Sequence, residues 1–191
     1  MVLAAGRGLR FGGDTPKPLL EFGGHTLVSR ALNAALGSGL EPVVVVVSDD
    51  RVAGALPAGV RVARNAAPEA GISSSLHAGL RALEAEADVD GAVIGLADQP
   101  LVGAAAYARV AAAFDGGARL AVATYGGVRG NPVLVGREHW AEALELRGDN
   151  GARMLLRLHG GVEVPCDGTG EATDVDTPED LAALEHRLLE H

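Results

Sequence analysis

The sequence has few of the residues that mark several common protein classes. Of 191 residues, 3% are aromatic, Cys166 is the single cysteine and Lys17 is the single lysine. One cysteine excludes a disulfide scaffold and a thiolate-rich zinc or iron–sulfur site. No run of about 18 apolar residues occurs, and the chain opens without the basic region of a secretory signal. We therefore expect a reduced, cytoplasmic protein without a membrane partner.

The charge and the apolar content narrow the class further. A net charge of −9 argues against a general nucleic-acid binder, because such proteins present a basic face. An apolar fraction of 48% and the lack of a collagen-like period exclude disordered and fibrous proteins. No repeat or linker interrupts the chain, so residues 1–191 are predicted to form a single domain. We expect a monomer, with a dimer as the alternative.

Short apolar runs alternate with longer segments of helical periodicity. The five valines of Val43–Val47 are typical of a strand covered on both faces. The predicted strands are Val2–Ala5, Val43–Val47, Val60–Ala63, Ala92–Leu96, Leu120–Ala123, Pro132–Val135 and Val162–Val164. The predicted helices are Thr26–Leu36, Ser75–Ala87, Ala104–Phe114, Glu138–Leu146, Gly151–Leu158 and Pro178–Leu189, the last with Thr177 as N-cap. This alternation predicts an α/β fold, a three-layer Rossmann-like domain with a mostly parallel sheet, whose ligands bind beyond the carboxyl ends of the strands.

A glycine-rich segment, residues 3–19, follows the first predicted strand. Glycines allow backbone N–H groups to approach phosphate oxygens closely. The segment also holds the cations Arg7, Arg10 and Lys17, which an anionic ligand would neutralise. The glycine spacing matches neither the Walker A motif nor the dinucleotide fingerprint. The segment predicts a phosphate-binding loop, and a solvated surface turn is the alternative.

Carboxylates follow two of the predicted elements. Asp98 comes directly after a buried strand, and Asp174 and Asp176 share one face of an extended segment. Mg²⁺ is bound by one or two carboxylates together with phosphate oxygens and water. These residues are therefore candidate metal ligands. The alternatives are a turn cap at Asp98 and exposed acids before the last helix.

Two further polar segments precede predicted helices. Ser73, Ser74 and Ser75 stand where a helix N-terminus could bind a base edge or a phosphate, or where one serine serves as N-cap. A polar turn over residues 148–152 leads to Arg153, which could meet a phosphate. Both segments are candidate ligand contacts.

The segment Leu3-Ala4-Ala5-Gly6-Arg7-Gly8-Leu9-Arg10-Phe11-Gly12, followed by Lys17, resembles the signature of the MobA-like NTP transferase family. It is most similar to the molybdenum cofactor cytidylyltransferase branch. The resemblance continues through Gly71-Ile72-Ser73-Ser74-Ser75, Asp98-Gln99-Pro100, Gly130-Asn131-Pro132, residues 148–153 and residues 174–181. It covers nearly the whole chain.

The resemblance implies a fold of the nucleotide-diphospho-sugar transferase type and a Mg²⁺-dependent nucleotidyltransferase. An NTP, with CTP favoured, would donate NMP to a phosphorylated acceptor, the molybdopterin-type molybdenum cofactor, and release pyrophosphate. It implies catalytic roles for Lys17, Arg10 and Asp98, with Asp98 and Asp176 as metal ligands and Asp174 in reserve. Implied nucleotide contacts are Leu3, Ala4, Ala5, Gly6, Arg7, Gly8, Lys17, Asn65, Gly71, Ser73, Ser74 and Ser75, and implied acceptor contacts are Asn131, Pro132 and Arg153.

Three alternatives to this function stay open. The transferred nucleotide could instead be GMP, as in a molybdenum cofactor guanylyltransferase. A sugar-1-phosphate nucleotidylyltransferase would use the same phosphate-binding loop with another acceptor. A non-enzymatic nucleotide-binding regulator could keep the loop without turnover, although two candidate metal carboxylates favour an enzyme.

Overall fold

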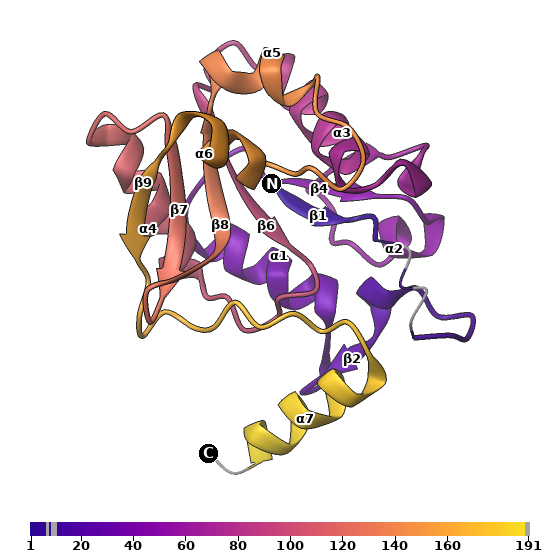
Figure 1. Ribbon diagram of the computed structural model, residues 1–191. Coiled ribbons are helices and arrows are strands. Elements are labelled where there is room, and N and C mark those ends of the chain that lie inside the picture. Colours follow the sequence, from indigo (N-terminus) through magenta and orange to yellow (C-terminus); the bar gives the residue numbers. More distant parts are fainter. Residues whose placement is uncertain (7, 9–10, 190–191) are drawn as a thin grey trace.

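The computed structural model describes residues 1–6, 8 and 11–189 (Figure 1). In this part of the chain, a 7-stranded sheet has the order β5-β4-β1-β6-β8-β7-β9. The strands are β1 (Val2–Ala4), β4 (Val44–Val47), β5 (Arg61–Arg64), β6 (Gly91–Leu96), β7 (Leu120–Tyr125), β8 (Val128–Gly136) and β9 (Val162–Pro165). Strand β8 runs antiparallel to β6 and β7, whereas β1, β4, β5 and β6 pair in parallel, as do β7 and β9. The predicted mostly parallel sheet is confirmed.

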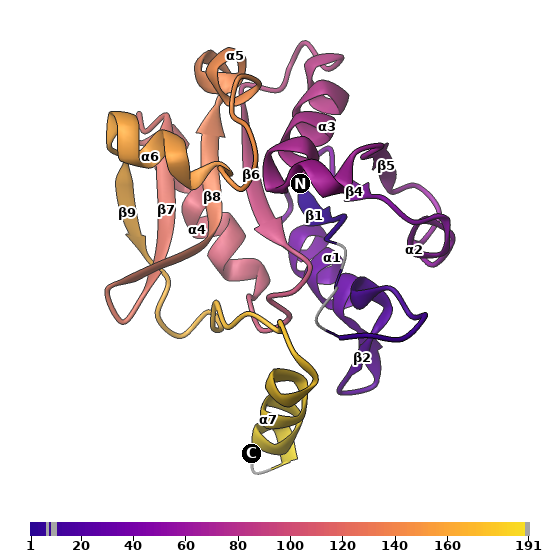
Figure 2. The same ribbon diagram turned by 45° about the vertical axis from the view of Figure 1, so that its right-hand side comes forward.

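Helices cover both faces of the sheet, as Figure 2 shows. One face carries α1 (Leu27–Gly37) and α4 (Ala104–Asp115), and the other carries α3 (Ile72–Glu84), α5 (Trp140–Ala143) and α6 (Arg153–His159). Val44 and Val46 pack into one core and Val45 and Val47 into the other, because side chains alternate along a strand. The valine run is therefore buried on both sides. Among the described residues, no helix is long and apolar enough to cross a membrane.

A third, smaller core joins the two ends of the chain. The hairpin of β2 (Glu21–Phe22) and β3 (His25–Thr26) lies beside α7 (Pro178–Leu189) at the bottom of Figure 1. The buried residues of this small core are Phe22, Leu27, Val175 and Leu184. This contact brings the segment before α7 next to the segment after β1.

The structure departs from the predicted elements at several boundaries. Strand β8 begins at Val128 instead of residue 132, because Gly126 and Gly127 both have positive φ and form a tight hairpin turn. The predicted helix at 138–146 is a 3₁₀ turn, η3 (Arg137–His139), followed by the short α5. Hairpin β2–β3 and the short helix α2 (Asp50–Gly54) were not predicted.

Gly95 in β6 provides a test of the packing between the sheet and α4. A Cβ at this position would overlap the hydroxyl of Tyr107, which is buried on α4. Gly95→Ala should therefore lower the free energy of unfolding by about 1–3 kcal/mol, as expected for an overpacked core. Urea unfolding followed by circular dichroism measures this change.

Gly54→Ala is the matched control. A Cβ at Gly54 would have open space, and the residue has no positive φ. It ends helix α2, where alanine is the better helix former. This variant should be as stable as the parent or slightly more so, and equal stability of Gly95→Ala and the parent would contradict the packing argument.

Candidate active site

Lys17 is a buried cation that packs closely against Gly8. It begins a 3₁₀ turn, η1 (Lys17–Leu19), and is 8% exposed. Gly8 has a φ of 57°, and a Cβ on it would lie 2.6 Å from the Cβ of Lys17. Any other residue at position 8 would therefore strain the backbone and push against the lysine. Two predicted contacts in this loop, Arg7 and Arg10, lie outside the described residues.

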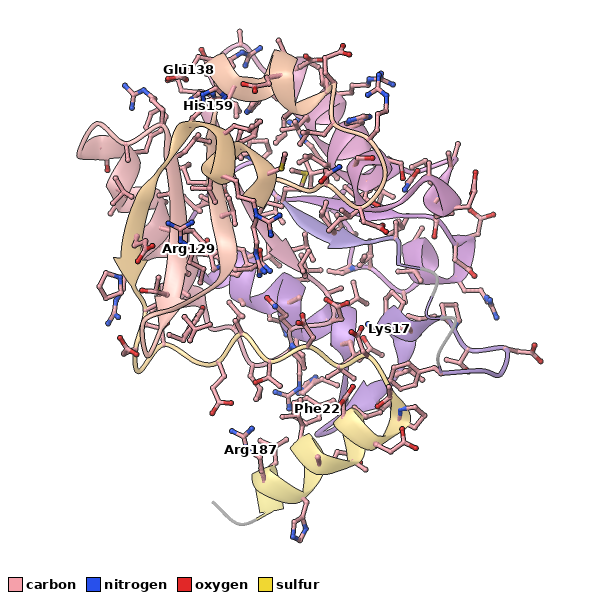
Figure 3. All side chains as sticks on the ribbon, in the orientation of Figure 1. Lys17, Phe22, Arg129, Glu138, His159 and Arg187 are labelled. Atoms are coloured by element: carbon pink, nitrogen blue, oxygen red, sulfur yellow. The ribbon has the colours of Figure 1, made fainter. Side chains whose placement is uncertain are left out.

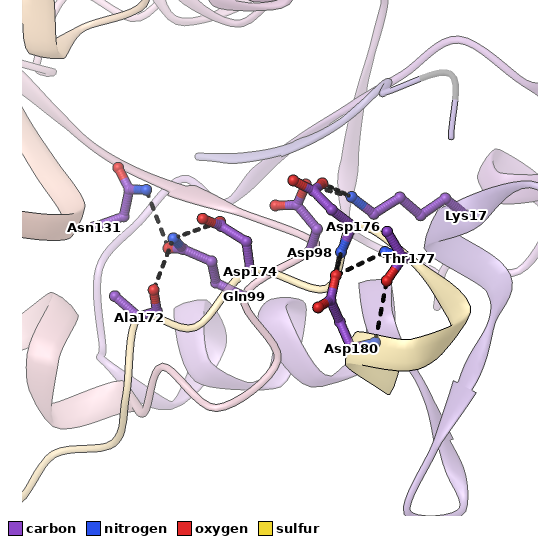
Figure 4. Close-up of polar contacts among 9 residues, drawn as sticks. All are labelled: Lys17, Asp98, Gln99, Asn131, Ala172, Asp174, Asp176, Thr177 and Asp180. Carbon is purple, nitrogen blue, oxygen red and sulfur yellow. Dashed lines mark hydrogen bonds and ion pairs between the residues drawn. The ribbon is translucent and has the colours of Figure 1, made fainter. Parts of the chain in front are cut away.

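Two carboxylates converge on the Lys17 ammonium group (Figure 4). Its Nζ lies 2.8 Å from Oδ2 of Asp98 and 2.9 Å from Oδ1 of Asp176. Asp98 follows the carboxyl end of β6, and Asp176 precedes α7. The sequence predicted that these three residues share one site, and the structure brings them together.

The electrostatics of Lys17 follow from this pairing. Burial alone would lower the pKa of the lysine, because it disfavours the charged form. The charge of Asp98 and the hydrogen bonds to both carboxylates act in the opposite direction and prevail, so the pKa of Lys17 is raised. The ammonium group is therefore fully protonated at neutral pH.

Backbone contacts align the segment before α7 with the end of β6. The N–H of Val175 donates to the carbonyl of Asp98 at 2.8 Å, which fixes Asp174 and Asp176 on either side of that contact. Further back, Gly103 donates to the carbonyl of Thr169, and the two segments form an isolated bridge between Val102 and Gly170. In Figure 1 this yellow segment runs from β9 to α7 across the bottom of the sheet.

A reciprocal cap fixes Asp176 from the other side. The N–H of Asp180 donates to Oγ1 of Thr177 at 3.2 Å, while Oδ2 of Asp180 accepts from the N–H groups of Thr177 and Asp176 at 2.8 and 3.0 Å. These hydrogen bonds lower the pKa of Asp180. The arrangement is a capping box with Thr177 as predicted N-cap. It orients the backbone of Asp176 towards the lysine.

Gln99, to which the sequence assigned no role, connects the two sides of the site. Buried at 2% exposure, it donates through Nε2 to Oδ1 of Asp174 at 2.8 Å. Its Oε1 accepts from Nδ2 of Asn131 at 3.0 Å, and the Asn131 carbonyl accepts from the Tyr125 hydroxyl at 2.9 Å. Only the position of Gln99 after Asp98 could have suggested this role.

Asp174 differs from Asp176 in its environment. By surface area it is exposed, but the pocket wall removes part of the water around its carboxylate, and this raises its pKa. The charges of Asp98 and Asp176 act in the same direction, against the Gln99 hydrogen bond. Asp174 thus faces the side of the site that contains Asn131.

The serine segment is ordered by Asn65 instead of capping its helix. Nδ2 of Asn65 donates to Oγ of Ser74 and of Ser75 at 2.8 and 3.0 Å. Helix α3 begins at Ile72 with Gly71 as N-cap, so the predicted start at Ser75 and the serine cap are both wrong. Gly71 has a φ of 88°, and a Cβ there would overlap Gly148. This close approach sets the serines beside the turn at 148–152.

Two adjoining hollows form a groove along the carboxyl ends of β1 and β6. One, of about 360 Å³, lies beside the glycine-rich loop and the start of α3, and the other, of about 280 Å³, lies beside α6 and Asn131. They share Leu3, Ile72, Leu96 and Asp149. Among the residues predicted from the sequence, the first is also lined by Ala5, Gly6, Gly71, Ser75 and Asp98, and the second by Asn131, Arg153 and Asp174.

Some predicted contacts are not on the groove wall. The side chain of Ala4 packs into the core beneath α1 and α4. Pro132 is buried within β8, and the N–H of Ser73 donates to the carbonyl of Gly148 at 3.1 Å. These residues support the groove walls. The side chain of Lys17 joins the site through its ion pair with Asp98, and that of Asp176 through its ion pair with Lys17.

The donor set fits a hard divalent cation. Asp98 and Asp176 are close enough to share one ion, since both contact a single nitrogen atom. Their side chains are 31% and 47% exposed, so solvent or a phosphate can reach the carboxylates. Oxygen ligands of this kind suit Mg²⁺ or Mn²⁺. The groove therefore combines a candidate metal site with a buried cation.

Two known relatives match this chain to different extents. Nicotine blue oxidoreductase from Paenarthrobacter nicotinovorans is 31% identical over 199 residues, which cover 96% of this chain and 94% of that protein. The bifunctional enzyme IspD/IspF from Clavibacter michiganensis is 40% identical over 99 residues, and the match covers 46% of this chain but only 23% of that relative.

The fold recurs in solved structures. Rv0371c from Mycobacterium tuberculosis H37Rv superposes with a TM-score of 0.83 at 28% identity and covers 97% of this chain and 95% of that one. A structure of Rv0371c in complex with manganese gives a TM-score of 0.78 at 27% identity, with 97% and 96% covered. The family model of the MobA-like NTP transferase domain matches residues 1–164. The chain therefore belongs to the MobA-like NTP transferase family, a family of nucleotidyltransferases.

Proposed function

We propose that this protein is a Mg²⁺-dependent nucleotidyltransferase that moves CMP from CTP to the phosphate of a molybdopterin-type molybdenum cofactor and releases pyrophosphate. The observation that carries the proposal is the convergence of Lys17, Asp98 and Asp176 at the mouth of the groove. Phosphoryl-transfer sites commonly combine a lysine that contacts the phosphates with acidic residues that hold Mg²⁺, and this site offers both kinds of group. The cytidylyl preference rests on the resemblance of the segment Gly71–Ser75.

The two hollows of the groove would hold the two substrates side by side along the carboxyl ends of the strands. The hollow beside the glycine-rich loop would take the nucleotide, with backbone amides of Ala5, Gly6 and Gly8 near the phosphates. The hollow beside α6 would take the acceptor, and the exposed Arg153 would meet its anionic group. The shared wall at Leu3 and Leu96 would hold the reacting ends side by side, which supplies proximity and orientation.

In the proposed reaction an oxygen of the acceptor phosphate attacks the α-phosphorus, and the bond to the β-phosphate oxygen breaks. An ammonium group has three N–H donors, so Lys17 can donate to a phosphate oxygen while it contacts the carboxylates. This contact would stabilise the charge on the departing pyrophosphate. Mg²⁺ held by Asp98 and Asp176 would neutralise charge on the transferred phosphate.

The geometry favours Asp176 over Asp174 as the second metal ligand. Asp176 shares Lys17 with Asp98, whereas Asp174 accepts a hydrogen bond from Gln99 and lines the acceptor hollow. Gln99 contacts both Asp174 and Asn131, so we assign it the positioning of that hollow. In this proposal Asp176 holds the metal together with Asp98, and Asp174 faces the acceptor.

An oxidoreductase is the second candidate, because the relative that matches this chain over nearly its full length bears that name. Hydride transfer needs a nicotinamide or flavin cofactor. The sequence lacks the dinucleotide fingerprint, and the groove offers a lysine with two carboxylates instead. The transferase is therefore the better supported of the two.

The decisive experiment measures pyrophosphate release from each of the four NTPs with Mg²⁺, with and without molybdenum cofactor. We expect release from CTP that depends on the cofactor. Preference for GTP would indicate the guanylyltransferase, and turnover with a sugar 1-phosphate would indicate the sugar nucleotidylyltransferase. Nucleotide binding without turnover would indicate a regulator, and oxidation of NADH or NADPH by the purified protein would favour the oxidoreductase.

Lys17→Ala and Asp98→Ala should each reduce turnover by about 10²-fold or more, because each removes a group that stabilises charge in the transition state. Steady-state pyrophosphate release from purified, folded protein measures the loss. Arg129→Ala is the matched control, since it removes an exposed ion pair with Glu163 away from the groove (Figure 3). Rates equal to the parent in either site variant would refute the assignment.

Asp176→Asn and Asp174→Asn separate the two acids. Asp176→Asn should weaken the affinity for Mg²⁺, so that half-maximal turnover needs about tenfold more metal, because a ligand charge is lost. Asp174→Asn should leave the Mg²⁺ requirement unchanged and raise the KM for the acceptor. The opposite pattern would transfer the metal role to Asp174.

A further inference from the structure

Outside the groove, two histidines and a glutamate form a cluster of candidate metal ligands. One ligand atom from each of His139, Glu142 and His159 lies within 4.8 Å of the other two. Nε2 of His159 is 2.6 Å from Oε2 of Glu142, and the ring centroids of the two histidines are 5.2 Å apart. Figure 3 labels His159 near the top of the molecule, on the far side from Lys17.

The cluster is assembled from two segments. His139 ends η3 and Glu142 lies in α5, three residues further along, so that both side chains occupy one face of the turn. His159 is the last residue of α6. The side chains of Glu142 and His159 are 41% and 42% exposed, so an ion can reach them from solvent.

We propose that His139, Glu142 and His159 bind a divalent transition metal of the Zn²⁺ type. Two imidazoles with one carboxylate are a characteristic Zn²⁺ ligand set, with water in the fourth position. Zn–N and Zn–O bonds of about 2.0–2.2 Å bring tetrahedral ligand atoms closer together than 4.8 Å, which rotation of half-exposed side chains accomplishes. The ion would take the place of the direct contact between Nε2 of His159 and Oε2 of Glu142.

The position of this site gives it a link to the groove. A metal bound there closes a loop from Glu142 to His159, and this loop contains the segment Asp149–Arg153 that lines the hollows. The ion would restrain that segment from outside, without supplying an atom to the groove. Metal binding by this cluster does not depend on the proposed reaction, because His139, Glu142 and His159 are distinct from Asp98 and Asp176.

Calorimetric titration of Zn²⁺ into the full chain tests the site. The experiment uses an Asp98→Asn background, so that binding in the groove does not mask the cluster. We expect one Zn²⁺ per chain, with affinity lowered at least about tenfold by His139→Ala and by His159→Ala. His25→Ala is the matched control, since it removes an exposed histidine of β3 outside the cluster.

His139→Ala is the decisive variant. His139 is not a partner in the hydrogen bond between Glu142 and His159. If these two residues formed only an ion pair and no metal site, removal of His139 would not change the Zn²⁺ affinity. Zn²⁺ affinity in His139→Ala equal to that of the parent would therefore overturn the proposal. Co²⁺ gives a second readout: the parent should show the visible absorption of a four-coordinate site and His139→Ala should lose it, while weak six-coordinate absorption in the parent would contradict the site.

Discussion

The shared ion pair of Lys17 with Asp98 and Asp176 is the constraint on which the rest of the site depends. The lysine is almost fully buried, and an unpaired buried charge is costly, so the fold must deliver acids to it. The two acids lie 81 and 159 positions along the chain from the lysine. The segments after β6 and before α7 must therefore pack beside Lys17 before both acids compensate its charge, and several features of the fold hold them there.

Two kinds of contact hold the segment before α7 beside the end of β6. The small core of Phe22, Leu27, Val175 and Leu184 attaches the C-terminal helix to the first hairpin by apolar packing. The hydrogen bond from Val175 to Asp98 then sets the register of the crossing segment against the end of β6. Apolar burial holds α7 against the hairpin, and the backbone hydrogen bond aligns the segment that carries Asp176. The acids are therefore oriented before any ligand binds.

Local patterns in the sequence predicted what local physics controls. The valine run, the alternation of strands with helices and the Thr177 cap each follow from a few neighbouring residues, and the structure has all three. Gln99 could not be found in this way, because its importance comes from contacts with Asp174 and Asn131, 75 and 32 positions away. The start of α3 was predicted wrongly for a similar reason: Asn65, which follows β5, donates to the hydroxyls of Ser74 and Ser75, and the helix begins at Ile72. The sequence thus predicted that Lys17, Asp98 and Asp176 lie together, but it did not predict the hydrogen bonds that Gln99 makes beside them.

The crossing segment between β9 and α7 has a consequence for truncation. Every strand of the central sheet precedes this segment, so a chain cut after β9 would keep all the strands of the sheet. It would lose Asp176, which is one of the two carboxylates that contact Lys17. Such a fragment would have the strands of the scaffold without the complete charge compensation at the lysine.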